Sequence, residues 1–125
     1  MRILLAEDDS SILTVAKLAL ARVGGHEVFT AKDGVETLEI LEKQRVDLIL
    51  LDIMMPRKNG FDTCKAIKNN PKTKSIPIIF LTAKAQTHEM QHGMSLGAVG
   101  YVLKPFDPMT LAEQIKSILE SHEAA

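Results

Sequence analysis

Short apolar segments recur along the chain and alternate with longer amphipathic ones. Residues 3–6, 48–51 and 76–81 are almost purely apolar. Unbroken apolar runs of this length are typical of parallel strands covered on both faces. Residues 26–30 and 99–103 mix apolar with polar side chains. We therefore predict five strands, with the three apolar ones in the centre of a sheet and the two mixed ones at its edges.

The intervening segments carry helical patterns. They comprise residues 10–23, 33–43, 59–69 and 87–96, and a last segment that begins at Asp107. In the first of them, helical spacing places four apolar residues on one side: Leu13, Ala16, Leu20 and Val23. Asp33 opens a capping-box-like start, and Asp107-Pro108 supplies an N-cap followed by proline at the first helical position. These signals predict a helix after every strand.

Five strands that alternate with five helices indicate a parallel sheet with right-handed crossovers. The strand order 2-1-3-4-5 places the three apolar strands in the centre, and it is the order of a flavodoxin-like (βα)5 doubly wound fold. A chain of 125 residues fits one domain, and we assign residues 1–125 to it.

Composition narrows the class of protein. The 15 basic and 16 acidic residues nearly balance, so no global charge favours binding to nucleic acid or to an anionic membrane. The single cysteine, Cys64, excludes an intrachain disulfide, and we find neither a signal peptide nor a membrane-spanning run. We expect a cytoplasmic protein, with no direct contact to nucleic acid or membrane.

Polar residues collect where the predicted strands end. Glu7 and Asp8 follow the first strand, Asp52 the third, Thr82 the fourth and Lys104 the fifth. In an open α/β sheet, ligands bind at this edge. Crowded carboxylates repel one another, and a hard cation such as Mg²⁺ relieves the conflict. Beside such a cation an aspartate can act as a nucleophile toward a phosphoryl group, with a lysine and a hydroxyl on the phosphoryl oxygens.

Five stretches of the sequence together resemble the receiver domain of two-component response regulators, and chemotaxis receivers among them. They lie in family order and spacing over essentially the whole chain: residues 3–9 (ILLAEDD), 47–56 (DLILLDIMMP), 60–61 (GF), 78–83 (IIFLTA) and 100–106 (GYVLKPF). The strand order above is that of chemotaxis receivers, so it is not independent support.

The resemblance implies a role for each residue at the strand ends. Asp52 matches the phosphoacceptor. Asp8 and Asp52, with the backbone carbonyl of Met54, match the ligands of Mg²⁺, and Glu7 matches a ligand that acts through water. Mn²⁺ or Ca²⁺ could substitute for Mg²⁺ at such a site. Asp9 falls outside the acidic pair and is expected to begin the first helix.

Other matching positions concern the phosphoryl group and the switch. Thr82, Lys104 and the backbone of Ala83 match groups that stabilise the phosphoryl oxygens. Thr82 and Tyr101 match the pair of switch residues, and the Lys104–Pro105 bond is expected to be cis. Lys84, two residues after Thr82, is expected to modulate hydrolysis.

The implied function is a phosphorylation-activated switch. A histidine kinase or a histidine phosphotransfer protein would donate the phosphoryl group, and the chain would catalyse only its own phosphorylation and slow autodephosphorylation. The face formed by helix 4, strand 5 and helix 5 would then bind a protein effector, or a domain missing from this chain. We expect a monomer or a phosphorylation-dependent dimer, although Val99, Gly100 and Gln114 replace the charged dimer contacts of one large DNA-binding subfamily.

Arg57 and Lys58 add positive charge near Asp52, which favours a phosphorylated or acidic partner unless both are merely solvated loop residues. A competing motif, HExxH, spans residues 88–92 and is the zinc-protease pattern. Its metzincin continuation fails, because Ser95 and Ala98 stand where glycine and histidine are required, so adventitious Zn²⁺ or Ni²⁺ binding is favoured over hydrolysis.

Three further alternatives use the same architecture. A dehalogenase-type phosphatase would need a second aspartate where Met54 stands. A flavodoxin would need a phosphate loop after the first strand, but this loop is acidic. A degenerate receiver that serves only as a scaffold is opposed by the complete set of strand-end residues.

Overall fold

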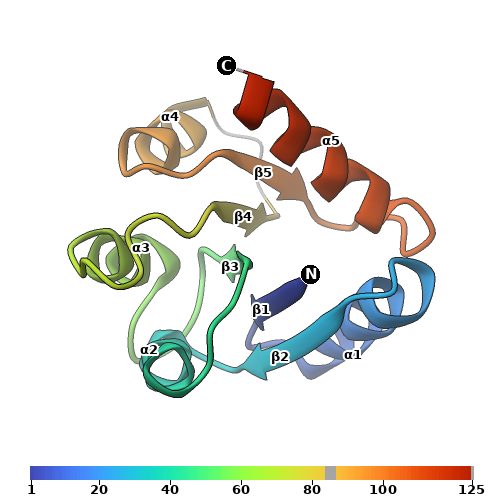
Figure 1. Ribbon diagram of the computed structural model, residues 1–125, viewed down its shortest axis with the longest axis horizontal. Coiled ribbons are helices and arrows are strands. Elements are labelled where there is room, and N and C mark those ends of the chain that lie inside the picture. The colour runs from blue at the N-terminus through green and yellow to red at the C-terminus, as the bar shows by residue number, and fades with distance from the viewer. Residues whose placement is uncertain (84–86, 125) are drawn as a thin grey trace.

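The computed structural model describes residues 1–83 and 87–124 and contains a parallel sheet flanked by helices (Figure 1). The strands are β1 (Arg2–Ala6), β2 (Glu27–Ala31), β3 (Leu48–Asp52), β4 (Ile78–Thr82) and β5 (Gly100–Leu103). The helices are α1 (Ser10–Leu18), the π-helical η1 (Ala19–Val23), α2 (Gly34–Lys43), α3 (Gly60–Lys68), α4 (Thr87–Ser95) and α5 (Leu111–Ala124). The predicted alternation of strands and helices is confirmed.

The sheet has the predicted order β2-β1-β3-β4-β5, and every neighbouring pair is parallel. All residues of β3 and β4 are buried, whereas β2 and β5 each have a single buried residue and are otherwise partly or fully exposed. The difference follows from the sequence, because only a strand covered on both faces can consist entirely of apolar side chains without exposing them. The fold is therefore the expected flavodoxin-like (βα)5 arrangement.

Helices cover both faces of the sheet. Helices α1 and α5 lie on one side, and α2, α3 and α4 on the other (Figure 1). Alternate residues of a strand serve the two layers: Leu4 and Leu51 pack toward α2–α4, while Leu5 and Leu50 pack toward α1 and α5. Each such leucine, fully removed from water, contributes roughly 1.5–3 kcal/mol.

Side-chain caps fix where three helices begin. Asp9 accepts from the backbone N–H groups of Ser11 and Ile12 before α1. Asp33 and Asn59 do the same before α2 and α3. Each cap satisfies donors that the first helical turn leaves unpaired. The expectation that Asp9 starts the first helix is confirmed.

Two local predictions were wrong. Val23 is 50% exposed rather than on the core side of the first helix. The π-helical turn η1 adds a residue to the turn and shifts the phase, so the 3.6-residue spacing no longer applies there. The last helix begins at Leu111 rather than directly after Asp107. Asp107 caps a preceding turn instead, because its side chain accepts from Met109 N (2.8 Å) and its carbonyl from Leu111 N (3.0 Å).

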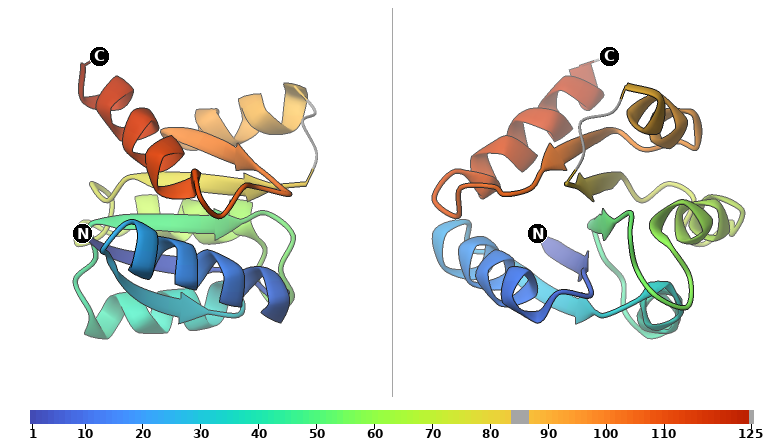
Figure 2. Two further views of the ribbon diagram at one scale, coloured as in Figure 1. Left: turned by 90° about the vertical axis from the view of Figure 1, so that its right-hand side faces the viewer. Right: turned by 180° about the vertical axis from the view of Figure 1, so that it is seen from behind.

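The parallel strands all end at the same edge of the sheet. Figure 2 shows in its left view that their arrowheads point the same way. Residues that directly follow β1, β3, β4 and β5 are therefore brought to one rim, although they are up to 97 residues apart in sequence. Within the described ranges, no helix is long and apolar enough to cross a membrane.

Candidate functional site

An acidic cluster lies at the carboxyl end of the central strands. Glu7 and Asp8 directly follow β1, and Asp52 is the last residue of β3. One carboxylate oxygen from each of the three lies within 4.8 Å of the others. Glu7 and Asp52 are buried, while Asp8 is exposed. Among the described residues, these three side chains form a group that could hold a metal ion. Its all-oxygen donors are those that a hard divalent cation prefers.

Lys104 places an ammonium group inside this cluster. The residue follows β5, and its Nζ donates to Glu7 Oε1 at 2.9 Å and to Asp52 Oδ1 at 3.2 Å. Only 14% of the Lys104 side chain is exposed. Two nearly buried carboxylates and one nearly buried ammonium group therefore share a single network, in which removal of the ammonium group would leave both carboxylates without their counter-charge.

The network perturbs the titration of its members. Burial raises the pKa of Asp52, and the neighbouring Glu7 raises it further through a shared hydrogen bond and like charge, against the opposing Lys104, to about 7. Burial acts to lower the pKa of Lys104, but the Glu7 hydrogen bond and the charges of Asp52 and Glu7 outweigh it, so the net direction is upward. The charge of Asp52 is thus sensitive to a nearby cation or to protonation near neutral pH.

The loop after β3 passes close to Asp52. The Met54 backbone N–H donates to Asp52 Oδ1 at 3.3 Å, and the Met54 side chain points outward, with 78% of the residue exposed. Gly60 permits the approach, since a Cβ there would collide with the Asp52 carbonyl oxygen and with Ile53 Cα. The loop therefore lies against the strand end, with the Met54 backbone beside the carboxylate.

The remaining matched positions surround the same rim. Thr82 ends β4 and is buried, while Ala83 directly after it is exposed. Tyr101 lies in β5 and is 41% exposed. The Lys104–Pro105 peptide bond is cis. Lys84 lies outside the described residues.

The loop position of Arg57 suggested a free positive charge near Asp52, but the structure shows a paired one. Its guanidinium binds the carboxylate of Asp33, with Nη2 to Oδ2 at 2.7 Å. Sequence reasoning recognised Asp33 only as a helix cap, because nothing in the local pattern indicates a pair 24 residues apart. The two histidines of the HExxH motif lie on α4, where His92 packs edge-on against Phe61 with ring centroids 4.7 Å apart.

A family model of the response regulator receiver domain matches residues 3–116 of the chain. The chain belongs to the response regulator receiver domain family. This assignment favours the receiver hypothesis over the zinc-protease, phosphatase and flavodoxin alternatives, and it agrees with the acidic cluster found at the strand ends.

The alkaline phosphatase synthesis transcriptional regulatory protein PhoP of Bacillus subtilis is 38% identical over 99% of this receiver. The transcriptional regulatory protein CpxR of Escherichia coli is 40% identical over 94% of it. The matches cover 50% and 49% of those relatives, so the chain spans about half their length. Similarity to both is therefore similarity to one part of a larger regulator.

Solved structures give the same family. The chemotaxis response regulator CheY4 of Vibrio cholerae superimposes with a TM-score of 0.87 at 35% identity, over 94% of this chain and 97% of that one. Receivers are switch modules of two-component systems that interact with histidine kinases and effector domains and bind Mg²⁺ at an acidic pocket. In this chain, the Glu7, Asp8 and Asp52 cluster is a group that could hold a metal ion.

Proposed function

We propose that this receiver accepts a phosphoryl group on Asp52 and changes its partner binding in response. The observation that supports the proposal most is the position of Asp52. Its carboxylate is buried, bonded to Lys104 and within 4.8 Å of the oxygens of Glu7 and Asp8. Such an arrangement has little structural purpose, because the crowded charges oppose one another, but it suits a group that must meet a cation and a phosphoryl donor.

The donor set fits Mg²⁺ by its chemistry. Asp8, Asp52 and the Met54 backbone carbonyl would hold the ion directly, and Glu7 would hold it through water. When bound, Mg²⁺ neutralises negative charge on the phosphoryl oxygens and fixes their orientation. Asp8 is the exposed member of the cluster, which leaves its carboxylate accessible to a hydrated ion from solvent.

The transfer itself is a nucleophilic displacement. A carboxylate oxygen of Asp52 attacks the phosphorus of a phosphohistidine on a histidine kinase or a histidine phosphotransfer protein. A new P–O bond forms, the P–N bond breaks, and the imidazole nitrogen keeps the electron pair of that bond. We assign the attack to Oδ2, because Oδ1 already accepts from Lys104 and from the Met54 N–H.

Three groups would stabilise the transferred phosphoryl group. The Lys104 ammonium pairs with one oxygen as a point charge. The Thr82 hydroxyl and the backbone N–H of Ala83 donate to others, from the end of the neighbouring strand β4. Hydrolysis by water later returns the carboxylate, so the chain acts only on its own phosphoryl group.

Thr82 and Tyr101 would transmit the change. Together with Ile53, Phe80 and Met90 they line a small interior cavity beneath α4. Movement of the Thr82 hydroxyl toward the phosphoryl group makes room there, and the partly exposed Tyr101 ring fills it. This exchange would alter the surface formed by α4, β5 and α5.

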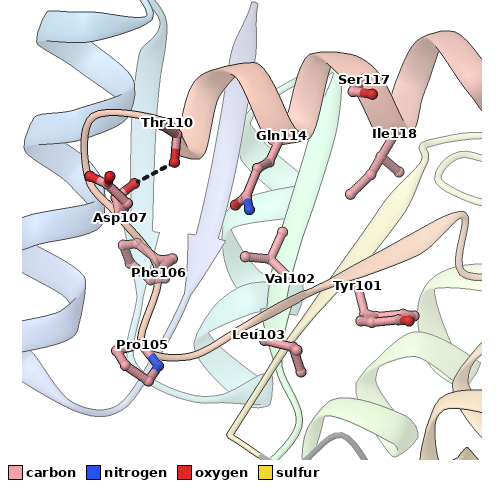
Figure 3. A pocket seen from close by; sticks show the side chains of 10 residues that line it. All are labelled: Tyr101, Val102, Leu103, Pro105, Phe106, Asp107, Thr110, Gln114, Ser117 and Ile118. Carbon is pink, nitrogen blue, oxygen red and sulfur yellow. Dashed lines mark hydrogen bonds between the residues drawn. The ribbon is translucent and has the colours of Figure 1, made fainter.

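An open groove of about 520 Å³ already lies on that surface (Figure 3). Figure 3 shows Tyr101 and Leu103 on β5, and Gln114 reaching from α5 toward the strand. A cytoplasmic protein effector, or a domain of a longer protein, would bind this groove. Because Val99, Gly100 and Gln114 carry no charge, we favour a monomer over a dimer held there by ion pairs.

Incubation with acetyl phosphate and Mg²⁺ tests the proposal. Intact-protein mass spectrometry should show one phosphoryl group on the native chain and none on Asp52→Asn. Asp47→Asn is the matched control, because Asp47 precedes the same strand at its opposite end, and it should be labelled normally. Persistent acid-labile labelling of Asp52→Asn would overturn the assignment of the site, and an unlabelled native chain would favour a scaffold.

A further inference from the structure

An ion pair outside the acidic cluster holds the loop that follows Asp52. Arg57 donates from Nε to Asp33 Oδ2 at 2.8 Å, and its Nη2 lies 2.7 Å from the same oxygen. Only 9% of the Asp33 side chain is exposed, while 59% of the Arg57 side chain is. Because Asp33 also caps α2 through Glu36 N at 2.8 Å, the pair joins the loop to the first turn of that helix.

Backbone contacts place this loop tightly between α2 and β3. Gly34 N donates to Lys58 O at 3.2 Å, and Gly60 N donates to Ile53 O at 2.8 Å. A Cβ at Gly34 would collide with Lys58 O and the Thr63 hydroxyl, so α2 begins in direct contact with the loop. The segment from Ile53 to Lys58 is thus fixed at both ends, and its Met54 carbonyl lies between them.

Arg57 adopts a backbone conformation that arginine disfavours. Its φ is +63°, in the left-handed region that glycine adopts readily. For other residues this conformation is destabilising by of order 1 kcal/mol. Glycine would satisfy this turn at lower cost. The presence of arginine therefore requires a gain from its side chain, and the bonds to Asp33 are the gain that the structure provides.

We propose that the Asp33–Arg57 pair is a positioning device for the metal site. It fixes the turn three residues after Met54, and so holds the Met54 backbone beside the Asp52 carboxylate, to which the Met54 N–H already donates. Neither Asp33 nor Arg57 would touch the ion or the phosphoryl group. The inference rests on the proposed function, since it assumes that Met54 supplies a ligand to Mg²⁺.

Isothermal titration with Mg²⁺ on the full chain tests the inference. Arg57→Gly is compatible with the left-handed turn and removes the pair, and the dissociation constant for Mg²⁺ should rise about tenfold, the lower end of the usual cost of losing a group that orients a metal ligand. Asp33→Asn keeps an effective helix cap, removes the charge, and should weaken binding by a similar factor. Arg57→Lys, which retains the charge, should recover part of the loss.

The double variant Arg57→Gly with Asp33→Asn distinguishes a pair from two independent effects. Because the two residues act as one unit, the double variant should bind no more weakly than either single variant. Arg45→Gly breaks the exposed pair with Asp47 at the opposite end of β3 and should leave Mg²⁺ affinity unchanged. Circular dichroism melting without Mg²⁺ establishes whether each variant is folded. If Arg57→Gly is unfolded, the Mg²⁺ affinity of Asp33→Asn tests the positioning role.

Each possible result has a distinct meaning. Native affinity in Arg57→Gly and Asp33→Asn, or a double variant whose loss equals the product of the single losses, overturns the positioning role while leaving the metal site intact. A native chain that binds no Mg²⁺ overturns the metal site itself, and the positioning role with it. A shared tenfold loss, no further loss in the double variant, and partial recovery in Arg57→Lys support the inference.

Discussion

Asp47 and Asp52 flank the same strand and experience opposite environments. Asp47 directly precedes β3 and accepts from the Arg2 backbone N–H at 2.8 Å and from Arg45 at 3.1 Å. That backbone hydrogen bond, helped by the charge of Arg45 and opposed by burial, holds the pKa of Asp47 below its usual range. At the other end, burial and Glu7 raise the pKa of Asp52 to about 7.

The difference between the two aspartates separates a structural role from a functional one. The amino end of the strand stabilises its carboxylate as an anion, in reach of solvent and beside donors. The carboxyl end crowds its carboxylate against another, and within residues 1–83 and 87–124 the Lys104 ammonium group compensates both. A cost of this kind is expected where a site must accept a cation or a phosphoryl group.

Removal of the Lys104 ammonium group should have the largest effect on the difference between the two ends of β3. Lys104→Met leaves Glu7 and Asp52 without their buried cation, and we expect a loss of about 3 kcal/mol in the free energy of unfolding at pH 8. Because the pKa of Lys104 is raised, the ammonium group is fully charged at this pH, and deprotonation removes its contribution only above the ordinary lysine range. Urea denaturation at pH 8 and pH 5 measures the effect, which should shrink at pH 5, where Asp52 is protonated.

Lys104→Arg is the control for that experiment, because it retains the positive charge and should lose much less stability. Equal stability of Lys104→Met and the native chain at pH 8 would mean that the ammonium does not compensate the two carboxylates. The contrast between the strand ends would then have to come from burial alone.

The reverse effect is expected at Asp52. The pKa of Asp52 is higher in the folded chain than in the unfolded chain. The ionised carboxylate therefore lowers the free energy of unfolding, fully above about pH 7 and not at all below about pH 4. Asp52→Asn should therefore raise the free energy of unfolding by roughly 2 kcal/mol at pH 8 and by almost nothing near pH 4. Chemical denaturation across this pH range provides the measurement. If Asp52→Asn were less stable than the native chain at pH 8, the ionised Asp52 carboxylate would not be destabilising.

Most of the fold follows from sequence alone, because it depends on regular patterns. The apolar pattern indicates which strands are central, the order 2-1-3-4-5 satisfies that pattern, and parallel strands must end at one edge. The same rule brings Glu7, Asp52 and Lys104 to that edge. Local backbone geometry is less accessible, as the π-helical turn that rotates Val23 toward solvent has no distinct composition.

The Asp33–Arg57 pair shows the other limit of sequence reasoning. Arg57 is not a residue type that signals a left-handed turn, and its partner lies in a different βα unit. A charge in a loop is usually solvated, so its sequence gives no reason to seek a partner. Only the close contact of α2 with the loop, enforced at Gly34, brings the two side chains together.

Magnesium affinity should depend on pH because the ion and a proton compete for Asp52. Between pH 7 and pH 6 the dissociation constant should rise up to about tenfold, equivalent to ~1.4 kcal/mol, and it should level off above pH 8. Calorimetric titration at several pH values measures this dependence. A constant affinity from pH 6 to pH 8 would show that Asp52 is fully ionised there and that its environment resembles that of Asp47.

The smallest effect is expected at Asp47 itself. Asp47→Ala removes the acceptor of the Arg2 N–H and the partner of Arg45, and because 36% of the side chain is exposed we expect a loss of only about 1 kcal/mol. Its lowered pKa means that this contribution is present at neutral pH and disappears as the pH falls below the usual range of aspartate. Denaturation at pH 7 and pH 3 should show the difference from the native chain fading, which is the opposite of the trend at Asp52. A stabilised Asp47→Ala at pH 7 would mean that both ends of β3 carry destabilising carboxylates, and that the position of Asp52 alone does not mark the site.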